Sequence, residues 1–226
     1  MCRNNPITVT VEEKVLRDRA QQLFFLMGGF SETNPPTQYQ REDIEKVWQL
    51  VAQKIQIDTF VKPILTYSFS ENYMSLETEQ IFYNLPLAKY QEQITGAYAF
   101  LISQQPIIEK GQNTLEQLYT HIWQNAYLDA AREWLKEWIG KKYHSFVSQS
   151  IAPGFYGIAL HEMRKFYDIV AGQQTFVRLR EDGMLEPEKS VLGMYLTLTE
   201  DINIFGRQCA SCFARGKNCE FCMDKL

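Results

Sequence analysis

Four of the five cysteines lie within the last eighteen residues, and their spacing is that of a metal site. They are Cys209, Cys212, Cys219 and Cys222, arranged as C-x2-C-x6-C-x2-C. Two residues between paired thiols let both sulfurs turn toward one centre, where four thiolates complete a zinc shell or hold an iron–sulfur cluster. The spacing therefore predicts a four-thiolate site for one of these two groups. A redox-sensing or disulfide-bonded tail has the same spacing and is the alternative.

The surroundings of the cysteines favour metal binding in the cytoplasm. Positive charge stabilises thiolates, and four basic residues lie close to the cysteines in the chain: Arg207, Arg215, Lys217 and Lys225. The N-terminus lacks the apolar core of a secretory signal. Clustered cysteines without an export signal indicate metal ligands in a reducing compartment rather than a disulfide framework. We therefore expect a cytoplasmic protein.

Length and composition set the broad class. The chain has 226 residues, of which 45% are hydrophobic, so it can bury a full core. A net charge of -4 argues against a nucleic-acid partner. The sequence contains no apolar run long enough to predict a transmembrane helix. We divide the chain into a body, residues 1–208, with a mainly helical part at 1–58, and a metal-binding tail, residues 209–226.

Apolar periodicity predicts helices in the first part of the chain and strands farther on. Two amphipathic helices are expected over Val11 to Met27 and Arg41 to Gln56. Strands are expected over four stretches with β-forming residues or short apolar runs: Phe60–Phe69, Ile94–Ile102, Thr175–Arg180 and Val191–Leu198. Pro63 places the first of these at a sheet edge or at a strand start, because proline cannot donate to a β-ladder.

The longest predicted helix lies between Thr114 and Gly140. Thr114 and Gln117 have the form of a capping box, and Gly140 is placed to end the helix. Apolar pairs recur every four residues between them, so the apolar stripe drifts by about 40° per step around the helix. Its two ends are therefore expected to contact different neighbours, as in a central helix that crosses a sheet and other helices.

The stretch Ile151 to Gly157 predicts a rigid turn before a short helix, about Ala159 to Val170. Pro153 and Gly154 form the turn, and Gly157 leaves room for a close backbone approach. A turn that opens into a helix N-terminus offers amide N–H groups to a polar ligand. The alternative is a simple connector.

Two short motifs resemble the activation, or reactivation, domain of vitamin B12-dependent methionine synthase. The first is Ala152-Pro-Gly-Phe155, and the second runs from Met184 to Tyr195 and contains Ser190-Val-Leu-Gly193. The family has an (A/S)-P-G-(Y/F) turn, a helix, and an M-x-P-x-x-S-V-x-G segment in this order. Its free-standing members include proteins that end in paired C-x2-C knuckles.

The resemblance implies an α+β fold, with an antiparallel sheet flanked by helices and a long central helix. It also implies S-adenosylmethionine binding at Ala152, Gly154, Phe155 and Gly157, and docking on a protein that carries cobalamin. The family's ligand motif is R-x-x-x-G-Y, in which Phe155 replaces the tyrosine and Ser150 stands at the arginine position. Serine cannot replace the five-donor fork of that arginine.

Two functions from different classes follow. The first is an accessory protein of corrinoid methyl transfer, in which the cysteine site holds an electron-carrying iron–sulfur cluster or a structural zinc. Its partner would be a corrinoid protein or a corrinoid methyltransferase. The second is a binding or scaffold module whose C-terminus is fixed by a zinc knuckle.

No catalytic residue can be assigned from the sequence. Four carboxylates surround the 183–189 loop, where a solvated charged turn is the simpler interpretation: Glu181, Asp182, Glu186 and Glu188. His144 and His161 lack a nucleophile partner in the sequence. Whether the chain is itself an enzyme stays open.

Overall fold

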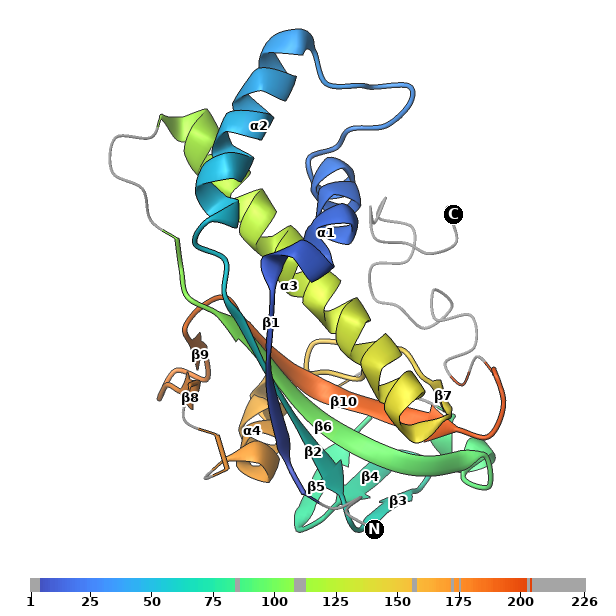
Figure 1. Ribbon diagram of the computed structural model, residues 1–226. Coiled ribbons are helices and arrows are strands. Elements are labelled where there is room, and N and C mark those ends of the chain that lie inside the picture. The colour runs from blue at the N-terminus through green and yellow to red at the C-terminus, as the bar shows by residue number, and fades with distance from the viewer. Residues whose placement is uncertain are drawn as a thin grey trace.

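A five-stranded antiparallel sheet forms the centre of the computed structural model (Figure 1). Its strand order is β1-β2-β6-β10-β7. The strands are β1 (Ile7–Val11), β2 (Ile57–Ile64), β6 (Ile94–Gln104), β10 (Ser190–Leu198) and β7 (Phe146–Val147). The structure describes residues 5–83, 86–107, 113–155, 158–171, 173–174, 176–202 and 204. The expected antiparallel sheet is confirmed.

The two faces of the sheet carry different layers. One face is covered by the helices α1 (Glu13–Met27), α2 (Gln38–Ala52) and α3 (Thr114–Tyr143). The other face is covered by a second antiparallel sheet, a short helix and a small hairpin. These elements are β3 (Tyr67–Phe69), β4 (Tyr73–Leu76), β5 (Glu79–Phe82), α4 (Met163–Val170), β8 (Arg178–Leu179) and β9 (Leu185–Glu186). Short 3-10 helices span Leu87–Tyr90 and Leu160–Glu162.

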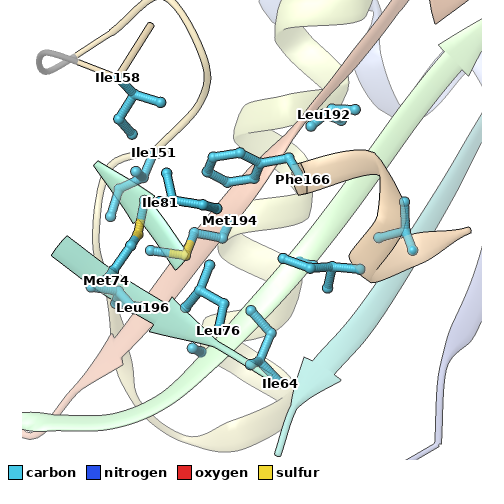
Figure 2. Packing of buried hydrophobic residues seen from close by; sticks show 14 of the residues in the cluster. Ile64, Met74, Leu76, Ile81, Ile151, Ile158, Phe166, Leu192, Met194 and Leu196 are labelled. Atoms are coloured by element: carbon cyan, nitrogen blue, oxygen red, sulfur yellow. The ribbon is translucent and has the colours of Figure 1, made fainter. Parts of the chain in front are cut away.

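Side-chain alternation along the strands builds a hydrophobic core on each face. Phe60 points into the core shared with β3–β5 and α4, whereas its neighbour Val61 points into the core shared with α1–α3. The same two-residue alternation separates Leu101 from Phe100, because successive strand side chains point to opposite faces. Figure 2 shows the first of these cores, in which Met194 of β10 lies among side chains of the second sheet.

Helix α3 crosses the sheet and contacts different neighbours along its length, as its drifting stripe predicts (Figure 1). In the N-terminal half of α3, the Trp123 ring stacks on Phe24 of α1 with 4.2 Å between centroids. At its C-terminal end, the Tyr143 ring stacks on Tyr98 of β6 with 4.6 Å between centroids. The prediction of a central helix is therefore confirmed.

Both predicted ends of α3 are shifted in the structure. Asn113, not Thr114, is the N-cap: its side chain accepts from the Glu116 amide, and the Glu116 carboxylate accepts from the Asn113 amide. The helix passes through Gly140 and ends at Tyr143, followed by His144 in a left-handed conformation. A left-handed residue after the last turn ends the hydrogen-bond ladder as effectively as glycine does.

Several shorter elements differ from the sequence prediction. Val11 ends strand β1 instead of beginning the first helix, and the second helix runs from Gln38 to Ala52. The stretch predicted as one strand over Phe60–Phe69 is divided between β2 and β3. Pro63 lies in the part of β2 that extends beyond its pairing with β1 and pairs there with β6 alone, so β2 is locally an edge strand. Among the described residues, no helix has the length and apolarity needed to cross a membrane.

Candidate functional site

The Ala152–Phe155 turn lies against the edge of β10. The Ile151 amide donates to the Met194 carbonyl at 2.9 Å, and the Met194 amide donates to the Ile151 carbonyl at 2.8 Å. The two sequence segments that carry the family resemblance, one ending at Phe155 and the other containing Gly193, are therefore in direct contact.

Gly193 makes this close approach possible. A Cβ atom at position 193 would lie 2.5 Å from the Ile151 carbonyl oxygen and 3.1 Å from the Ala152 Cβ. A contact of 2.5 Å with a backbone atom is too short for any larger residue. The glycine of the Ser190–Gly193 motif therefore has a definite structural role, which is to admit the turn to the sheet edge.

Two amides of the turn donate hydrogen bonds within the turn itself. Gly154 has a φ of 88° and donates its amide to the Ile158 carbonyl at 2.8 Å. The Phe155 amide donates to the Ala152 carbonyl at 3.2 Å. The α-helix begins only at Met163, after the 3-10 helix Leu160–Glu162, so its N-terminus does not lie at the turn. Both amides are therefore satisfied within the turn, and ligand binding at the turn stays a prediction.

Buried side chains anchor the turn on the side of the core, and its solvent-facing side is apolar. Ile151 and Ile158 are buried in the core near Ile81, as Figure 2 shows. Phe155 and Leu160 are instead 55% and 69% exposed. Because Ile151 and Ile158 hold the backbone on both sides of the turn, the exposed side chains of Phe155 and Leu160 project from a fixed backbone.

The chemistry of the turn suits only part of an S-adenosylmethionine molecule. Ala152 is buried, Gly154 has no side chain, and Phe155 offers an exposed aromatic face. Such a surface can stack on a flat heterocycle, but it supplies no cation for a carboxylate. Ser150, at the family's arginine position, is half-buried and also uncharged. The fourth predicted ligand residue, Gly157, lies outside the described residues.

An ion pair with a buried carboxylate follows the turn, and sequence reasoning missed it. The Glu162 carboxylate is 6% exposed and lies 2.8 Å from the Lys165 ammonium, which also donates to the Gln80 carbonyl of β5 at 2.7 Å. The Glu-x-x-Lys spacing on one helical face is the signal that would have found it. His161, 3.6 Å from Glu162, has an exposed side chain. The pair fastens the start of α4 to the second sheet.

A second group of polar residues lies over β10 on α3. The buried Tyr195 hydroxyl donates to the Arg132 carbonyl at 2.7 Å, and the Arg132 guanidinium lies 3.1 Å from the Asp129 carboxylate. Burial raises the pKa of Asp129 above its ordinary value, against the opposing charge of Arg132. The sequence contains no pattern that singles out Asp129.

Two of the four carboxylates around the 183–189 loop form surface ion pairs. The Glu186 carboxylate lies 2.7 Å from the Arg178 guanidinium across the β8–β9 hairpin, and Asp182 lies 2.6 Å from Arg180. The hydrogen bond from Arg178 lowers the pKa of Glu186, which makes its carboxylate a weaker base. These contacts agree with a solvated charged turn.

The predicted metal ligands Cys209, Cys212, Cys219 and Cys222 lie outside the described residues, so their site stays a prediction. In the part of the chain that the structure describes, no group of three or more histidine, cysteine or acidic side chains is placed to hold a metal ion.

Layers and topology define the class of fold: a curled antiparallel sheet with a long helix across one face and a second small sheet on the other. No protein-family model matches the chain, and no curated protein matches it. Among solved structures, it is similar to the crystal structure of the MetH reactivation domain bound to AdoHcy, with a TM-score of 0.68. The alignment covers 96% of this chain and 86% of that chain at 13% sequence identity. The likeness confirms the fold that the two short motifs imply.

Proposed function

We propose that this protein is an accessory factor of corrinoid methyl transfer that docks on a cobalamin-carrying protein. The observation that carries the proposal is the combination of a reactivation-domain fold over nearly the whole chain with direct contact between the two motif segments. A fold alone does not define a function, but a fold with its motif residues assembled at one edge supports one.

The test is the reductive methylation of cob(II)alamin carried by a methionine synthase cobalamin domain. With a chemical reductant and S-adenosylmethionine present, adding this protein should raise the rate at which methylcobalamin forms. Heat-denatured protein serves as the control. A rate that does not change with added protein would contradict the accessory role.

We further propose that S-adenosylmethionine, or its product AdoHcy, binds at the turn with its adenine ring against Phe155. Base–aromatic stacking contributes about 1–3 kcal/mol, so Phe155→Ala should weaken binding by roughly tenfold or more. Phe82→Ala is a matched control, because Phe82 is similarly exposed but lies on β5. Calorimetry of the intact protein measures both. No heat at millimolar ligand, or equal loss in the two variants, would remove this ligand from the turn.

The cysteine tail is proposed to supply the electron for reactivation. Reductive methylation of cob(II)alamin consumes one low-potential electron, which an iron–sulfur cluster can deliver and zinc cannot, because zinc has no redox chemistry. Anaerobically purified protein should then contain iron and sulfide and show a broad visible absorption. Cys209→Ser and Cys222→Ser should abolish that absorption, whereas Cys2→Ser should not. A colourless protein with one bound zinc would instead assign the tail a structural role.

A further inference from the structure

A cavity of about 560 Å³ lies where α3 ends beside the start of β6 and the end of β10. Figure 1 shows these three elements meeting at one end of the central sheet, next to β7. The cavity is lined by residues of all four elements and lies farther along β10 than the Ala152–Phe155 turn. A volume of this size accommodates a small organic molecule.

The C-terminal end of a long helix forms one wall of the cavity. Tyr143, His144 and Ser145 line it, and they are the last residue of α3 and the two that follow. The carbonyl groups at the end of a helix carry a partial negative charge, which attracts cations near that end. With 30 residues, α3 is long enough for this effect to be fully developed.

Aromatic rings form part of the same lining. Tyr98 and Tyr143 are stacked, and the neighbouring Phe146 is 50% exposed. The face of an aromatic ring attracts a cation through its quadrupole, most strongly a cation that is easily stripped of water.

The described lining contains no lysine, arginine, aspartate or glutamate side chain. Hydroxyl groups of Thr95 and Thr197 meet at 3.0 Å, and Thr199 completes this side. The two lysines in the last turn of α3 direct their ammonium groups back along the helix: Lys141 lies 3.4 Å from Glu137, and Lys142 lies 4.8 Å from the centre of the Trp138 ring. Neither lysine lines the cavity.

We propose that this cavity binds a quaternary ammonium compound. Such a cation has no N–H groups and therefore needs no dedicated acceptors, while the helix end and the exposed Phe146 ring both favour its positive charge. The threonine and serine hydroxyls suit a polar group elsewhere on the same molecule. An anion is disfavoured, because the lining offers it no lysine or arginine. The inference is independent of corrinoid chemistry.

Choline and its uncharged isostere, in which carbon replaces the nitrogen, have nearly the same shape and differ in charge. Comparing their affinities therefore isolates the effect of the charge. In calorimetry or ligand-observed NMR on the full chain, choline should bind about tenfold more tightly than the isostere. Phe146→Leu should reduce this ratio severalfold, whereas Phe82→Leu, an equally exposed phenylalanine on β5, should leave it unchanged.

A second variant adds a positive charge and tests the proposal without changing the packing of the aromatic rings. Thr199→Lys introduces an ammonium group at the exposed rim and should lower choline affinity by about tenfold, while Thr199→Gln should not. Equal binding of choline and the isostere, or no binding of choline at millimolar concentration, would overturn the proposal. So would loss of binding in Phe82→Leu, because that would place the site on the second sheet.

Discussion

Gly193 shows how one residue determines whether the candidate site can form. The turn reaches β10 only because position 193 has no side chain, and the Ile151 carbonyl fills the space that a Cβ atom would need. The same missing atom leaves room for the Phe100 ring, whose tip would lie 3.1 Å from it. The sheet, the turn and the hydrophobic core therefore all meet at position 193.

Replacing Gly193 with alanine should displace the turn and destabilise the protein by about 1–3 kcal/mol, because overpacking against backbone cannot be relieved by a side-chain rotation. Urea unfolding measures the change. Gly29→Ala is the control: an added Cβ there meets no atom within 4 Å, and only its positive φ of 73° costs about 1 kcal/mol. A Gly193→Ala variant as stable as the wild type would mean that the turn is free to move away from β10.

At the scale of elements, the start of α3 depends on a cap that sequence reasoning placed one residue late. Asn113 and Glu116 form the capping box, whereas Thr114 is already helical. We expect Asn113→Ala to cost about 1 kcal/mol in unfolding free energy, since it leaves the Glu116 amide without its acceptor. Thr114→Ala should change stability by less than about 0.5 kcal/mol. A larger loss of unfolding free energy for Thr114→Ala than for Asn113→Ala would instead identify Thr114 as the N-cap.

A carboxylate that joins three helices gives the stability a definite pH dependence. Glu13 of α1 accepts hydrogen bonds from Arg17 and from Tyr127 of α3, whose hydroxyl also accepts from Trp48 of α2 at 3.0 Å. Burial by itself raises the pKa of Glu13, but the hydrogen bonds from Arg17 and Tyr127 and the charge of Arg17 outweigh it and lower the pKa below 4.5.

Because the folded pKa of Glu13 lies below the unfolded one, its contribution to stability is present above about pH 4.5 and is lost as the pH falls through the folded pKa. Glu13→Gln should lower the unfolding free energy by about 2 kcal/mol near neutrality and flatten its fall in acid. Glu137→Gln, at an exposed pair with Lys141, is the control and should change neither. Parallel pH profiles for Glu13→Gln and the wild type would contradict this role.

The helices and the longer strands could be predicted from periodicity in the sequence. Contacts between residues far apart in the chain could not. The drifting stripe of α3 and the apolar run of β6 follow from local pattern alone. Strand β1 has only five residues, and its half-buried pattern depends on pairing with β2. The ion pair of Glu162 and Lys165 has a local signal, but its burial depends on the second sheet. The hydrogen bond from the Gly154 amide to the Ile158 carbonyl could likewise not be predicted from local pattern.

On the scale of the whole molecule, the central sheet separates two cores that are closed by different parts of the chain. The helices α1, α2 and α3 close one, and β3–β5, α4 and the β8–β9 hairpin close the other. Ile204, the last described residue, is fully buried in the core shared with β3–β5 and α4. The body therefore includes Ile204, and the boundary at 208 stays a prediction.

This arrangement predicts how the protein responds to C-terminal truncation. Ending the chain after Gln208 should remove the metal content but change the unfolding free energy by less than about 0.5 kcal/mol, because both described cores stay complete. Ending it after Ile202 also deletes Ile204 and should cost about 2–4 kcal/mol, as expected for losing a fully buried isoleucine. Metal analysis and urea unfolding of the two truncated proteins provide the comparison. A body that unfolds when only residues 209–226 are removed would show that the cysteine tail is part of the folded core, and the division into body and tail would then be wrong.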